Sequence, residues 1–278
     1  NHPVFRRVAS GGHADLLTLE RHVDERGRLA GEIKVEDARA VAHFLHLTPA
    51  EGGWRVVVID GAEEMNRNAA NAVLKIIEEP PSQALILLVS HAPGRLLATI
   101  RSRCRRLALQ ALDETAMQQF LAERLPALAG EEMHLLVRLA EGSPGRALDL
   151  AERGGLALFR EMMALLATLP RLDPAGLHRL ADRMAGAQGE TAYRTLDELL
   201  LWWLARLIRA AGTRELPSEV VAGEAALCGR LAAAGSLDRW LEVWEKTGYL
   251  LSRADSVNLE RKQVVLNAFL ALEAAARA

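Results

Sequence analysis

The sequence predicts an α/β domain followed by an all-α region, and three observations support this. The 278-residue length allows two or three domains. In the first third, short apolar runs alternate with helical patterns, which is the order of a parallel sheet. After about residue 111 the strand patterns cease, and Ala and Leu recur at helical spacing. We therefore expect one parallel sheet and then helical bundles.

The predicted sheet is built from largely apolar runs of strand length, as buried parallel strands are. These runs are DLLTLE at 15–20, WRVVVID at 54–60 and ALILLVS at 84–90. Two helices are predicted between them. The first, over 34–47, stops before Pro49, and the second, over 68–79, stops at Pro80-Pro81, because proline cannot continue a helix.

The helical part is punctuated by stretches rich in Gly and Pro, which are typical of helix junctions. They lie at 142–147, 169–176, 185–190 and 215–219. We see no repeat of 30 to 40 residues, so we expect two bundles and not a repeat array. The predicted domains are therefore 1–110, 111–166 and 170–278.

The composition narrows the class of protein. The formal net charge of -2, from 34 basic and 36 acidic residues, argues against a globally basic nucleic-acid binder. Two cysteines, Cys104 and Cys228, make neither a disulfide framework nor a four-cysteine zinc site, and no apolar run reaches the ~20 residues of a membrane span. We expect a cytoplasmic protein without membrane contact. Because the chain starts at Asn1 and not at Met, we also expect its natural N-terminus to lie upstream.

Four arginines surround one cysteine in TIRSRCRRLAL, residues 99–109; they are Arg101, Arg103, Arg105 and Arg106. From the residues alone two interpretations are open. The first three alternate, as on the solvated edge of a strand. Alternatively, a guanidinium here meets an anion, since its planar fork of donors suits phosphate. Cys104 is interpreted as a small core residue, not as a nucleophile.

Asp60 ends the apolar run VVVID, where a parallel strand would point it into a ligand-binding crevice. It is either a Walker B aspartate, which holds Mg²⁺ on a nucleotide, or a turn residue before Gly61. The chain has no P-loop, and no Gly-Lys pair occurs anywhere in it. We therefore expect poor ATP binding by these residues.

Longer motifs in the sequence give a specific resemblance to a known family. NAVLKIIEEPP at 71–81, followed by VSHAPGRLLATIRSRC at 89–104, resembles the AAA+ clamp-loader subunits of bacterial DNA polymerase III, and among them the δ′ type. GSPGRAL at 142–148 and DSVNLERKQVVLNAF at 255–269 follow in the family's order. The resemblance therefore spans nearly the whole chain. It implies an incomplete AAA+ domain without its first strand and P-loop, a helical lid and a C-terminal collar bundle, over the three ranges given above.

The resemblance assigns site residues. It implies that Arg103, in the Ser102-Arg103-Cys104 motif, is an arginine finger that reaches the ATP held by a neighbouring γ/τ subunit. Three further positions correspond to a degenerate nucleotide site: Asp60 at Walker B, Ser90 at sensor 1 and Arg146 at sensor 2. For Arg146 a purely structural role is equally open, in which it caps a helix or forms an ion pair.

The residue after Asp60 indicates the type of subunit. Active relatives carry a glutamate there that polarises the attacking water, whereas this chain has Gly61 and then Ala62. Glu63 and Glu64 come too late and are expected to open the next helix. The resemblance thus implies δ′-like inactivity, with no cofactor or metal on this chain and with ATP and Mg²⁺ on the neighbour.

The function implied is that of a non-catalytic stator within the DNA polymerase III holoenzyme, a nucleotidyltransferase. Its partners would be the γ/τ and δ subunits, with the sliding clamp and primed DNA reached through the complex, and the isolated chain could be monomeric. Two alternatives remain open. One is a γ/τ-type ATPase whose P-loop lies upstream, and the other is a helical scaffold with a degenerate AAA+ shell.

Overall fold

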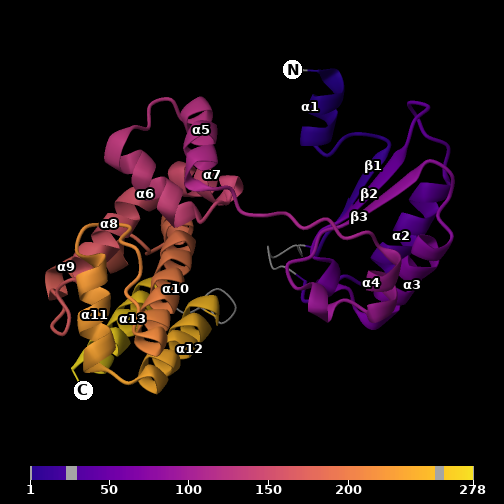
Figure 1. The fold of residues 1–278 in the computed structure, drawn as a ribbon. Coiled ribbons are helices and arrows are strands. Elements are labelled where there is room, and N and C mark those ends of the chain that lie inside the picture. Colours follow the sequence, from indigo (N-terminus) through magenta and orange to yellow (C-terminus); the bar gives the residue numbers. More distant parts are fainter. Residues whose placement is uncertain (1, 23–29, 254–259, 278) are drawn as a thin grey trace. The chain divides into compact units, whose positions relative to one another are not determined.

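The computed structural model describes residues 2–22, 30–253 and 260–277, and Figure 1 shows them as a ribbon. The chain forms two compact units, Asn1–Leu109 and Gln110–Ala278. The first contains the sheet, and the second has helices and no strand among its described residues. Of the motif at 255–269, residues 255–259 lie outside the described residues.

The sheet of the first unit has three parallel strands in the order β1-β2-β3. They are β1 (Leu16–Leu19), β2 (Arg55–Ile59) and β3 (Ala84–Leu88), joined through α2 (Val35–His46) and α3 (Arg67–Glu78). Each coincides with a strand or helix expected from the sequence. The predicted parallel α/β fold of an incomplete AAA+ domain is therefore confirmed.

The two long helices cover one face of the sheet (Figure 1). Val57 and Ile59 of β2 are buried there with Val41 of α2 and Val73 of α3. This one-sided core follows from the period of two residues along a strand, since alternate side chains point to opposite faces. Leu85 and Leu87 of β3, which alternate with the core residues, remain exposed.

Short helices complete the first unit: α1 (Pro3–Ala9), the 3-10 turns η1 (Ala62–Glu64) and η2 (Pro93–Arg95), and α4 (Ala98–Arg103). The interpretation of the arginine cluster as a strand edge is wrong, because Arg101 and Arg103 lie in α4. The N–H groups of Ile100 and Arg101 both donate to the Leu97 carbonyl, and Ile100 is buried. Burial of this one apolar side chain fixes a helical turn where alternation alone would also fit a strand.

The second unit contains nine α-helices and one 3-10 turn in its described residues. They are α5 (Glu114–Arg124), α6 (Gly130–Ala140), α7 (Pro144–Glu152), α8 (Gly155–Leu166), α9 (Pro174–Asp182), η3 (Ala187–Gly189), α10 (Glu190–Thr213), α11 (Glu224–Ala234), α12 (Leu237–Arg253) and α13 (Arg261–Ala276). Their buried side chains form one continuous cluster that includes Phe159, Trp203, Trp240 and Phe269. The division of this unit into a lid at 111–166 and a collar at 170–278 stays a prediction.

Within the described ranges, no helix has the length and apolar composition that a membrane span requires. The same residues bring together no group of three or more His, Cys, Asp or Glu side chains suited to a metal ion.

Candidate functional site

Asp60 and Gly61 form the turn at the carboxyl end of β2. Asp60 is exposed, and its N–H donates to the Leu19 carbonyl at 2.8 Å. Gly61 has φ +67°, in the left-handed region that side chains with a Cβ avoid. A glutamate at this position would therefore strain the backbone. At position 61 the turn therefore presents no side chain.

Glu63 of η1 anchors the loop that follows β3. Its Oε1 accepts hydrogen bonds from the N–H groups of His91 at 2.9 Å and Ala92 at 3.1 Å. Burial alone would raise the pKa of Glu63, but hydrogen bonds from its own N–H and from those two N–H groups, together with the nearby Ser90 hydroxyl, lower it. Glu63 is thus held as an ionised structural group, which suits it poorly for taking a proton.

Ser90, the sensor 1 candidate, follows β3 just as Asp60 follows β2. The two loops are joined by hydrogen bonds from Val89 to Ile59 and from Ala62 to Val89, each at 2.9 Å. Ser90 Oγ is buried near the Glu63 carboxylate and has no hydrogen-bond partner among the described residues. Ser90 and Asp60 therefore belong to the same edge of the sheet, with Ser90 turned toward its own unit.

Arg103 is the last residue of α4. Its Nη2 lies 2.8 Å from Glu78 Oε1, and its Nη1 donates to the Thr99 carbonyl at 3.2 Å and to Ser102 Oγ at 3.4 Å. The side chains of Arg103 and Glu78 are 43% and 40% exposed. The guanidinium is thus held by its own unit at one side and open to solvent at the other.

The two neighbours of Arg103 in the Ser-Arg-Cys motif have structural roles. Ser102 Oγ donates to the Thr99 carbonyl at 3.0 Å and accepts from Arg103, so it supports the guanidinium. Cys104 ends the helix in an extended conformation and is partly buried. Burial raises the pKa of the Cys104 thiol, which keeps it protonated and weakly nucleophilic.

Arg146, the sensor 2 candidate, lies in the second unit, in the first turn of α7. Its N–H donates to Ser143 Oγ at 3.3 Å, and Pro144 begins the helix, as the sequence predicts. The guanidinium forms ion pairs with Glu198 at 2.9 Å and Glu141 at 3.3 Å. The ion-pair interpretation therefore describes the geometry, and a role in sensing nucleotide stays a prediction.

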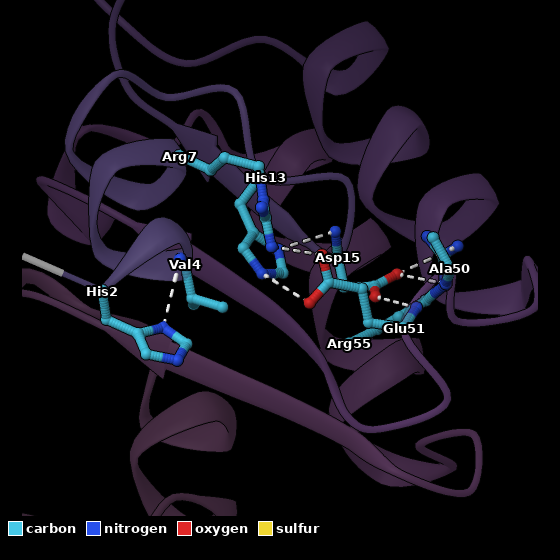
Figure 2. Close-up of polar contacts among 8 residues, drawn as sticks. All are labelled: His2, Val4, Arg7, His13, Asp15, Ala50, Glu51 and Arg55. Carbon is cyan, nitrogen blue, oxygen red and sulfur yellow. Dashed lines mark hydrogen bonds and ion pairs between the residues drawn. The ribbon is translucent and has the colours of Figure 1, made fainter.

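A polar cluster around Asp15 was not found by sequence reasoning (Figure 2). The Asp15 carboxylate accepts hydrogen bonds from the N–H groups of Ala50 at 2.8 Å and Glu51 at 2.9 Å, and Arg55 lies 3.5 Å away. These two hydrogen bonds, helped by the charges of Arg55 and His13, lower the pKa of Asp15. The cluster fixes the start of β1 to the loop before β2.

The same cluster reaches two helices. The Arg55 guanidinium donates to the carbonyls of Phe44 and Thr48 at the end of α2, and it lies 4.6 Å from the centre of the Phe44 ring. On the other side, Arg7 of α1 pairs with Glu51 at 2.6 Å. No local sequence pattern predicts these contacts, because they join segments that are distant in the sequence. They give the cluster a structural role.

Comparison with known proteins agrees with the fold. Residues 2–113 match the family described as "DNA polymerase III, delta subunit". The DNA polymerase III subunit delta' of Pseudomonas aeruginosa is 40% identical over 147 residues, which cover 53% of this chain and 43% of that protein. The delta' subunit of Escherichia coli is 36% identical over 143 residues, covering 51% and 41%. The tau subunit of Escherichia coli is 30% identical over 240 residues, covering 82% and 36%.

With its parallel sheet followed by a helical unit, and with these similarities, the chain resembles the class of DNA polymerase III clamp-loader subunits. Within that class the chain is δ′-like, and the recognition made from its motifs is confirmed. The chain spans less than half the length of these relatives.

Proposed function

We propose that this chain is a non-catalytic clamp-loader subunit that donates Arg103 to the ATP site of a neighbouring γ/τ subunit while a sliding clamp is placed on primed DNA. One observation carries the proposal. Arg103 ends a helix whose preceding turn is fixed by buried Ile100, and about two fifths of its side chain faces solvent. Such a group can reach a phosphate outside its own chain.

The chemistry asked of Arg103 is electrostatic. An arginine supplied in trans stabilises the charge that develops on the transferred phosphoryl group and accelerates the reaction by about 10^3- to 10^5-fold. To do so, Arg103 must either have N–H donors left for the phosphate or give up its ion pair with Glu78 and bind the phosphate instead. An exposed ion pair is worth only about 0.2–1 kcal/mol, so a charge-assisted contact in a dry interface can compete with it.

The same proposal places ATP and Mg²⁺ on the neighbour and none on this chain. In support, the turn after β2 has a glycine in the left-handed region at position 61, and a glycine offers no side chain to polarise water. Glu63 is engaged with the loop after β3. Arg146 is already neutralised by two carboxylates.

The second unit offers a surface for packing against the γ/τ and δ subunits. On α12, Leu237, Leu241 and Trp244 recur at helical spacing, and each is more than one third exposed. An apolar stripe of this kind on a helix is typical of protein contacts. In this proposal the protein works in the cytoplasm, its isolated chain is monomeric, and it reaches the clamp and DNA through the complex.

The test is an Arg103→Ala variant of the complete protein, reconstituted with γ/τ and δ subunits. We expect DNA-stimulated ATP turnover and clamp loading to fall, with assembly unchanged by size-exclusion chromatography. Arg101→Ala is the matched control, because Arg101 is exposed on the same short helix. If ATP turnover is the same for Arg103→Ala and wild type, Arg103 is not an arginine finger and the proposal is wrong on this point.

A second candidate is an ATP-hydrolysing subunit of the γ/τ type. The tau subunit of Escherichia coli favours it, because that match covers 82% of this chain against 53% and 51% for the two δ′ subunits. Calorimetry of ATP binding to the complete protein separates the two. Tight binding together with turnover by the subunit alone would support this second candidate.

A further inference from the structure

The ends of two helices of the first unit meet at Arg103. Glu78 is the last residue of α3, and Arg103 is the last residue of α4. Both helices are anchored by buried side chains close to these ends, Ile76 on α3 and Ile100 on α4. The carboxylate and the guanidinium therefore face each other from fixed backbones, with Nη2 2.8 Å from Oε1.

The contacts leave part of the guanidinium available. Nη1 uses both of its hydrogens, on the Thr99 carbonyl and on Ser102 Oγ, and Nη2 uses one on Glu78. An arginine has five N–H donors, so one on Nη2 and the one on Nε are left by these contacts. These two nitrogens can bind two oxygens of a phosphate side by side.

We propose that Glu78 is a positioning residue for Arg103, which holds the guanidinium in the direction of the neighbouring subunit's nucleotide. This inference rests on the proposed function. A free arginine side chain samples many rotamers, and holding it in one conformation beforehand removes that entropy cost from the phosphoryl-transfer step. Glu78 does this from outside the helix, while Thr99 and Ser102 do it from within.

The geometry favours positioning over sequestration. Glu78 and Arg103 are both about two fifths exposed, and an exposed ion pair is weak because water screens it. A weak pair can orient the side chain and still yield to a phosphate. A pair that withheld Arg103 would have to bury the guanidinium and take all its donors, and this one does neither.

The test is Glu78→Gln in the complete protein, reconstituted with γ/τ and δ subunits. Glu79→Gln is the matched control, because Glu79 is the adjacent glutamate and has no ion pair with any residue in the described ranges. For Glu78→Gln we expect kcat of DNA-stimulated ATP turnover to fall about two- to fivefold, with KM for ATP and assembly unchanged, as loss of a weak exposed pair predicts. Glu79→Gln should match wild type.

A double variant shows whether Glu78 acts through Arg103. In an Arg103→Ala background we expect Glu78→Gln to cause no further loss, since the residue that it positions is gone. Additive losses would overturn the inference, and so would a Glu78→Gln variant with wild-type or increased kcat. If Arg103→Ala itself has wild-type turnover, the proposed function fails and Glu78 has nothing to position. If Arg103→Ala lowers turnover but Glu78→Gln has wild-type kcat, the proposed function stands and this inference fails.

Discussion

A buried ion pair joins two helices of the second unit and offers a sharp test of its packing. Arg206 Nε of α10 lies 3.1 Å from Glu224 Oε1 of α11, and their side chains are 10% and 0% exposed. The other oxygen, Glu224 Oε2, accepts a hydrogen bond from the Val220 N–H at 2.7 Å. We predict that Glu224→Ala strongly destabilises this unit.

The size of the stability loss depends on the contacts that Arg206 keeps after Glu224 is replaced. Arg206 would keep its hydrogen bond to the Ser218 carbonyl and its position 4.7 Å from the Trp202 ring, but it would lose its counter-charge. Removing one partner of a buried pair costs about 3–5 kcal/mol, and the two remaining contacts place our expectation near the lower end, about 3 kcal/mol. Replacing both residues by apolar ones, Arg206→Met with Glu224→Leu, should cost less than the single change.

Urea unfolding followed by tryptophan fluorescence measures this effect. Four of the five tryptophans lie in the second unit, at positions 202, 203, 240 and 244, so the signal reports mainly on that unit. Glu215→Ala, in the exposed loop before α11, is the control and should change stability by less than about 0.5 kcal/mol. A loss below about 1 kcal/mol for Glu224→Ala, or a double variant as unstable as the single one, would refute the reasoning.

Two further predictions concern the same unit and use the same assay. Gly142 has φ +77°, and a Cβ there would lie 2.5 Å from the Leu112 carbonyl oxygen, so Gly142→Ala should cost more than about 2 kcal/mol; a cost under 0.5 kcal/mol would contradict the left-handed turn. Burial, and then the charge of Glu198, raises the pKa of Asp197 from its ordinary 3.8 to about 6. The folded state thus binds this proton more tightly than the unfolded chain does, and stability falls as the pH rises from about 4 through 6. Asp197→Asn should therefore raise the urea midpoint at pH 7.5 and leave it nearly unchanged at pH 4, and a lower midpoint at pH 7.5 would count against this.

The strands and long helices were predictable because their signals are local. Apolar runs located the three strands, and Pro80-Pro81 located the end of α3. The short helices α1 and α4 were missed. In α4 the arginines alternate, which fits a strand as well, and only the burial of Ile100 decides for a helix.

The candidate site was predictable in part. The Ser-Arg-Cys motif singled out Arg103, and the resemblance implied that the turn after Asp60 lacks a base. The partner of Arg103, Glu78, could not be found in this way, because the two residues lie in different helices and no spacing rule connects them. The Asp15 cluster and the ion pair between Arg206 and Glu224 were not predicted from the sequence for the same reason.

By itself, the sequence determined the order of the three strands and of the long helices between them, the family resemblance and which arginine to test. Periodicity, proline positions and motifs are properties of neighbouring residues. Only the tertiary structure decided that Gly61 occupies a left-handed turn and that Glu78 holds the Arg103 guanidinium. Backbone dihedral angles in a loop and contacts between separate helices depend on how the whole unit packs, and no local stretch of sequence contains that information.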